Sequence, residues 1–143
     1  FLAMRLSSKK SGWWADHLKS VILESPAASI PMLVKMKVGV LWKPTRLLIR
    51  RIIRKEAKRI HPDLPLRFMD AKVPQIGMPN MPVLTLQSKV DETLGRSHYK
   101  LLKKHLKKNR ENKFHLISDL KHSTDFDSTT RRELLENWLK DRS

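Results

Sequence analysis

Along much of the chain, apolar residues recur every three or four positions, as they do on one face of an α-helix. The run that begins at Trp13 is stopped by Pro26, which predicts a helix over residues 12–24. Pro44 suits a first helical position and precedes a longer run of the same spacing. This run predicts a helix over residues 45–60, and similar runs predict helices over residues 88–110, 111–122 and 129–142.

Residues 32–42 fit two patterns at once. The positions that alternate as in a strand are Met32, Val34, Met36, Val38 and Val40. The positions that share a helical face are Leu33, Met36, Val40 and Leu41. We favour a helix, because a strand would need partner strands that the sequence scarcely offers elsewhere.

Residues 61–87 contain five of the eight prolines together with several apolar residues. The five are Pro62, Pro65, Pro74, Pro79 and Pro82. Such a density of proline excludes a regular helix and a central strand. Because the segment is apolar and not rich in Ser or Glu, we expect an extended arm that lies along a partner surface.

These patterns predict a mainly α protein of extended shape, in which several short amphipathic helices are joined by a proline-rich non-regular arm without one large core. The expected regions are a basic helical N-terminal region over 1–60, the arm over 61–87 and a helical C-terminal region over 88–143. The best apolar stretch, Ile30 to Trp42, is interrupted by two lysines, so we expect no membrane span.

Charge separates the chain from an ordinary soluble domain. Lys and Arg number 30 and Asp and Glu 14, for a net charge of +16. Such an excess is usually neutralised by a polyanion, either nucleic acid or an anionic membrane surface. Residues 1–60 hold 14 of the basic residues and 3 of the acidic ones, whereas residues 123–143 are slightly acidic.

Two basic clusters are candidate RNA-binding sites. Charged helix faces are ordinarily just solvated, but residues 43–60 contain only one acid, Glu56, to offset their cations. We therefore expect both clusters to contact RNA phosphates, the Arg-rich one more deeply, without reading sequence. The first cluster is Lys43, Arg46, Arg50, Arg51, Arg54, Lys55, Lys58 and Arg59, and the second is Lys100, Lys103, Lys104, Lys107, Lys108 and Arg110.

The last predicted helix is a candidate for docking to a protein. A capping box at Thr130 and Glu133 marks its start. Its apolar face consists of Leu134, Leu135, Trp138 and Leu139, with Trp138 as the expected anchor in a partner pocket. The alternative is that this face folds back onto the chain's own segment 111–122.

Catalytic and cofactor-binding patterns are missing from the sequence. There is no cysteine, and the four glycines are scattered, so thiolate chemistry, zinc ribbons and phosphate-binding glycine loops are excluded. The two histidine pairs spaced seven apart would lie about 10 Å from each other on a helix, too far for one metal ion. We therefore expect a protein that is not an enzyme and has no cofactor, no metal and no small-molecule substrate. The adjacent Trp13 and Trp14 could stack on bases or anchor their helix to protein.

In its organisation the chain resembles the lineage-specific proteins of mitochondrial ribosomes. The features that carry the resemblance are a basic N-terminus composed like the end of a transit peptide, short amphipathic helices and a proline-broken arm. The resemblance implies a structural subunit in the mitochondrial matrix whose partners are rRNA and neighbouring ribosomal proteins. One alternative is an accessory subunit of a mitochondrial inner-membrane complex, with basic helices facing anionic lipid. A chromatin-like DNA-binding protein is another.

Overall fold

The protein is described by a computed structural model that covers residues 2–8, 10–38, 43–60, 72–75, 77–92, 94–120 and 127–142. Two compact units are present. Unit 1 consists of Phe1–Ala28 and Val73–Ser143, and unit 2 is Ser29–Lys72 between them.

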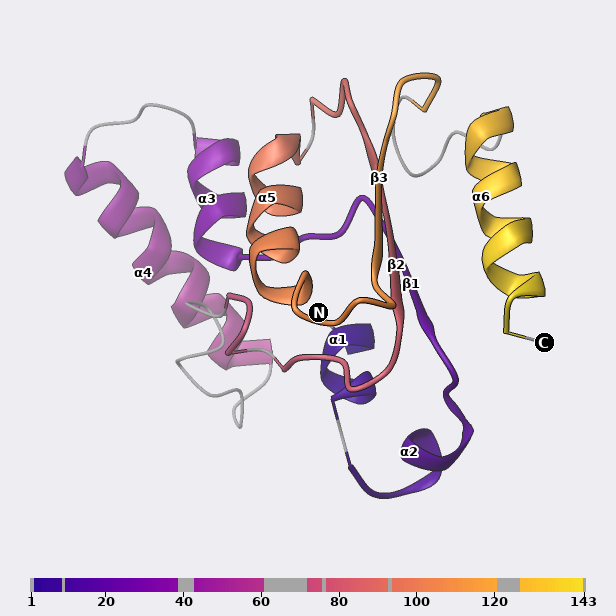
Figure 1. Ribbon diagram of the computed structural model, residues 1–143. Coiled ribbons are helices and arrows are strands. Elements are labelled where there is room, and N and C mark those ends of the chain that lie inside the picture. The colour runs from indigo at the N-terminus through magenta and orange to yellow at the C-terminus, as the bar shows by residue number, and fades with distance from the viewer. Residues whose placement is uncertain are drawn as a thin grey trace. The chain divides into compact units, whose positions relative to one another are not determined.

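Unit 1 is built around a parallel β-sheet (Figure 1). Its strands are β1 (Val21–Glu24), β2 (Val83–Ser88) and β3 (Lys113–Ile117), in the spatial order β1-β2-β3. The register pairs Val21 with Val83 and Leu84 with Lys113. Because all strands run in one direction, their carboxyl ends lie at one edge of the sheet.

Helices cover both faces of this sheet. The helices of unit 1 are α1 (Leu2–Ser7), α2 (Trp13–His17), α5 (Gly95–Leu106) and α6 (Thr129–Lys140). α1 and α5 lie on one side of the sheet and α6 on the other (Figure 1). α5 is the crossover between β2 and β3, which parallel neighbours require.

Two apolar cores fill the space between the sheet and its helices. The core beneath α1 and α5 consists of Met4, Val21, Leu23, Ala28, Val73, Met81, Val83, Leu102 and Leu106. The core beneath α6 consists of Leu84, Leu86, Ile117, Leu120 and Trp138. Every residue of β2 is buried, because this strand has a neighbour on each side and a helical layer on each face.

Unit 2 contains two helices, α3 (Ile30–Val38) and α4 (Lys43–Ile60), which contact one another. The backbone N–H of Met32 donates to Oγ of Ser29 (3.3 Å), just before α3. An isolated bridge joins Ser29 to Lys72, so the two ends of unit 2 are held together.

The fold class predicted from the sequence was wrong: the protein is mixed α/β, with a parallel sheet and two cores, and is not mainly α. Residues 12–24 form the short α2 followed by β1, and residues 111–122 contain β3 in place of a helix. The expected arm ends in the central strand β2. The helix expected over residues 88–110 begins only at Gly95.

The other predicted helices are confirmed where the structure describes them. α3 takes the helical alternative for residues 32–38, α4 matches the prediction for 45–60, and α6 matches most of 129–142. Residues 39–42, 61–71 and 76 lie outside the described residues, so the first part of the arm stays a prediction.

Candidate polyanion-binding surfaces

α5 presents a buried face and a cationic face. His98, Tyr99, Leu102 and Leu106 are buried against the sheet. The exposed cations on the opposite face and in the following turn are Arg96, Lys100, Lys103, Lys104, Lys107, Lys108 and Arg110. Within the described part of the chain, none of these side chains forms an ion pair with a carboxylate. All members of the second predicted RNA-binding cluster therefore lie on one solvent-facing surface, the α5 cationic surface.

The orientation of α5 is fixed at its N-terminal end by buried polar contacts. Oδ1 of Asp91 accepts from the backbone N–H of Leu94 (2.9 Å), and Nε2 of Gln87 donates to Oδ2 of Asp91 (2.6 Å). The backbone N–H of Ala28 donates to Nδ1 of His98 (2.8 Å). This network joins the N-terminal part of α5 to β2 and to the segment that follows β1.

Sequence reasoning missed this network. The helix predicted over residues 88–110 included Asp91, whereas Asp91 precedes α5 and accepts from the backbone N–H of Leu94, the N-cap residue of α5. Nothing in the local sequence marks Gln87 or His98, because their partners are brought close only by the fold.

The first predicted RNA-binding cluster lies on α4 and is less uniform. Arg51, Lys55 and Arg59 are exposed, and Arg50 and Arg54 are half-buried. The side chains of Lys43, Arg46 and Lys58 lie outside the described residues. Nε of Arg59 contacts Oε2 of Glu56 at 3.0 Å, so one of the exposed cations has an acidic partner on its own helix.

Large apolar side chains share the exposed face of α4. Leu47, Leu48 and Ile52 are 65%, 58% and 51% exposed. Ile49 and Ile53 are half-buried, as expected for the inner side of the helix. Ile52 therefore lies on the outer side of the helix. The surfaces of α4 and α5 thus have different chemistry: mixed apolar and cationic on α4, cationic and polar on α5.

The docking face predicted on α6 is corrected by the structure. Trp138 is only 1% exposed and packs in the core of unit 1, and Leu134 and Leu135 pack against the same core. Leu139 is exposed. The structure therefore shows the alternative arrangement, in which this face closes onto the chain's own segment 111–122 and onto β2. Trp138 is therefore unavailable to a partner, whereas Leu139 is exposed.

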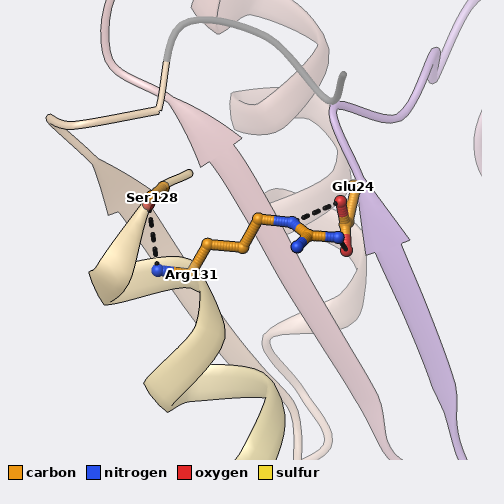
Figure 2. A network of polar contacts seen from close by, with 3 residues as sticks. All are labelled: Glu24, Ser128 and Arg131. Atoms are coloured by element: carbon orange, nitrogen blue, oxygen red, sulfur yellow. Dashed lines mark hydrogen bonds and ion pairs between the residues drawn. The ribbon is translucent and has the colours of Figure 1, made fainter. Parts of the chain in front are cut away.

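Polar contacts hold α6 against the end of β1 (Figure 2). Nε and Nη2 of Arg131 donate to the two carboxylate oxygens of Glu24, each at 2.9 Å. Oγ of Ser128 accepts from the backbone N–H of Arg131 (3.1 Å), so Ser128 caps the helix. The capping box expected at Thr130 and Glu133 is thus replaced by a cap two residues earlier.

Trp13 is the exposed aromatic residue of α2. It is 60% exposed, and its ring stacks on His17 with centroids 4.5 Å apart and planes 8° from parallel. Nδ1 of His17 also donates to the carbonyl oxygen of Trp13 (2.7 Å). The side chain of Trp14 lies outside the described residues, and base stacking by either tryptophan stays a prediction.

Among the described residues, no group of three His, Asp or Glu side chains is arranged to hold a metal ion. The helices of this part of the chain are also too short or too polar for any of them to cross a bilayer. No protein-family model, curated protein or solved structure matches the chain.

Proposed function

We propose that this protein is a structural RNA-binding subunit of a ribonucleoprotein, of the kind found in mitochondrial ribosomes, and that the α5 cationic surface makes its main contact with RNA phosphates. The observation that carries the proposal is the set of seven exposed cations on α5 and the turn after it, without a carboxylate partner in the described residues. When such cations neutralise phosphates, the counterions condensed on the RNA are released, which drives binding.

The chemistry of the α5 surface supports a phosphate backbone over a lipid surface as its partner. Lipid binding by a helix normally combines cations with inserted apolar residues. Every apolar side chain of α5 is buried or half-buried. Lysines dominate the exposed set, and as point charges they bind phosphate without demanding a particular base. We therefore expect recognition of RNA shape and backbone, with little discrimination among sequences of one fold.

The test is the salt dependence of binding to a structured RNA. Each phosphate contact contributes about 0.7 to 0.9 to the slope of log affinity against log salt. Replacing Lys103, Lys104, Lys107 and Lys108 by Gln should therefore lower the slope by about 3, if all these side chains meet phosphates. The matched control replaces Lys10, Lys19, Lys89 and Arg132, exposed cations outside both predicted clusters, by Gln. Equal loss of slope in both variants would show diffuse attraction and contradict a site on α5.

The mitochondrial location belongs to the same proposal and rests on the resemblance of organisation. Import of the protein into isolated mitochondria, followed by co-sedimentation with ribosomes that ribonuclease abolishes, is the expected result. Association that survives ribonuclease but not detergent would favour the inner-membrane alternative instead.

A further inference from the structure

The solvent-facing side of α4 has a regular arrangement. Residues four apart on a helix lie above one another, so Leu47, Arg51, Lys55 and Arg59 form one row. Leu48 and Ile52 lie in a parallel row beside it. The exposed fractions of 65%, 58% and 51% for Leu47, Leu48 and Ile52 place these large aliphatic side chains in water. We call these six residues the α4 mixed surface.

Neither water nor an RNA backbone is chemically complementary to both the apolar and the cationic side chains of the α4 mixed surface. Scattered exposed aliphatic residues are ordinary, but here the second and third turns of one helix expose three of them next to a row of cations. Phosphates would neutralise the cations and leave the leucines in water. The complementary surface must therefore offer apolar groups and negative charge together, within the length of one side chain.

We infer that the α4 mixed surface binds the interface of an anionic lipid bilayer. Leu47, Leu48 and Ile52 reach below the headgroups, while Arg51 and Lys55 contact lipid phosphates; Arg59, which pairs with Glu56, lies at the end of the row. Long basic side chains suit this position, because their methylene stems lie along the apolar layer and their charged ends stay at the headgroups. Binding in the plane of the membrane needs no spanning helix.

A protein partner fits the same surface less well. The buried centres of protein interfaces are depleted in charged residues such as Lys, although Arg is enriched at interfaces. A row of cations one turn apart would also need a matching row of acids on the partner. A bilayer supplies negative charge at any position along its plane, so it meets the whole row at once. Membrane binding by α4 goes beyond the RNA contact proposed for α5, and the two surfaces are tested independently.

The first experiment measures co-flotation of the full chain with vesicles. Vesicles of phosphatidylcholine mixed with an equal amount of phosphatidylglycerol should bind the protein, and pure phosphatidylcholine should not. Replacing Leu47 and Leu48 by Ser keeps the charge and should weaken binding about tenfold or more, because insertion of the leucines is lost. The matched control replaces Val90 and Leu139, which are similarly exposed at 60% and 57% on unit 1, by Ser and should bind as the wild type does.

The second experiment places a probe in the proposed contact. Because the chain has no cysteine, Leu48→Cys and Leu139→Cys each create a single site for an environment-sensitive fluorophore. The probe at position 48 should brighten and shift to the blue with anionic vesicles, and the probe at 139 should not. The α5 lysine variant should lose RNA affinity and still insert the probe at 48, which separates this inference from the proposed function.

Several outcomes would overturn the inference. Wild-type protein that ignores anionic vesicles would remove lipid as the occupant. Equal binding by the Leu47 and Leu48 double variant would reduce the contact to adsorption by charge. A probe at position 48 that responds to RNA and not to vesicles would assign the surface to RNA.

Discussion

Trp138 illustrates how much of this fold depends on single side chains. Its indole Nε1 donates to Oγ of Ser20 (3.2 Å), which satisfies the one polar atom of an otherwise buried ring. The guanidinium carbon of Arg142 lies 3.4 Å from the ring centroid, and Nζ of Lys113 lies 5.9 Å from it. The residue therefore joins α6 to the sheet by packing, hydrogen bonding and cation–π contact.

Replacing Trp138 by Ala should lower the free energy of unfolding by about 3–5 kcal/mol, as is usual for a large aromatic residue removed from a core. Chemical unfolding followed by circular dichroism would measure the change. Leu139→Ala, at an exposed neighbouring position, should stay within about 0.5 kcal/mol. Similar effects of both substitutions would show that the α6 face is not part of the core.

His98 couples the fold to pH. Burial lowers the pKa of His98 below its usual 6.5, against the opposing charge of Asp91. Burial also lowers the pKa of His115, together with the charge of Lys113. Each histidine therefore binds its proton more readily in the unfolded chain. The stabilisation that comes from keeping these histidines neutral is therefore fully present above pH 6.5, their usual pKa in an unfolded chain. The free energy of unfolding decreases as the pH falls below that value.

His98→Asn should keep an acceptor for the N–H of Ala28 and remove the titrating ring. We expect the loss of stability between about pH 7.5 and pH 5 to be smaller in this variant than in the wild type, because one proton-linked group is gone. Urea unfolding at a series of pH values gives the comparison. An identical pH dependence in both proteins would show that His98 is not the coupled group.

At the scale of elements, the three strands show where sequence reasoning could not reach. β1 spans only Val21–Glu24, too short for alternation to stand out after the helical spacing of the preceding residues. β3 places Phe114 and Ile117 three apart, which also fits a helix. Both strands are defined by hydrogen bonds to β2, and these partners are distant in the sequence.

β2 was hidden for a different reason. All its residues are buried, including Thr85, Gln87 and Ser88, so neither an alternating nor an apolar pattern marks it. Pro79 and Pro82 argued against a central strand, but both precede Val83 and remove no donor from the strand itself. The carbonyl of Pro82 accepts from the N–H of Val21 (2.9 Å) and so begins the pairing with β1.

The helices were easier to predict, because their hydrogen bonds are local. The spacing of apolar residues was enough to predict the helices α4 and α6. The clustering of lysines was enough to predict the basic surface of α5. Which apolar faces close onto the chain itself depends on the sheet, and the sheet was not foreseen. For that reason Trp138 was expected outside the core.

The Glu24–Arg131 pair should contribute measurably to the attachment of α6. Its side chains are only 20% and 15% exposed, and the geometry is bidentate. A double-mutant cycle with Glu24→Gln and Arg131→Gln should give a coupling free energy of about 1–3 kcal/mol, above the range of exposed pairs. Thermal or chemical unfolding of the four proteins supplies the cycle. Coupling near zero would mean that α6 is held by its apolar face alone.

At the scale of the whole molecule, unit 2 is an insertion whose two chain connections are adjacent. The backbone N–H of Val73 donates to the carbonyl of Ala28 (2.9 Å), and both residues are buried in unit 1. Unit 1 has its own sheet, and the described residues of its two cores all belong to unit 1. Nearly adjacent connections are typical of places where a chain tolerates insertion of a separate unit.

Replacing residues 29–72 with a short Gly-Ser linker should therefore leave a folded unit 1. We expect cooperative unfolding and dispersed amide resonances from the shortened protein, with RNA affinity retained through the α5 cationic surface. The same protein should no longer float with anionic vesicles, since α4 is gone. A collapsed spectrum without dispersion would show that unit 1 needs unit 2 to fold.

The parallel pairing of β1 with β2 also sets an order of events during synthesis. β1 leaves the ribosome first, but β2, its partner, follows only after all of unit 2 has been made. Chains emerge from the N-terminus onwards, and helices form far faster than distant strands can pair. We therefore expect α3 and α4 to form while β1 is still unpaired. A nascent chain would therefore display the α4 mixed surface before the sheet exists. The membrane contact that we infer for α4 is then available to the nascent chain before unit 1 is complete.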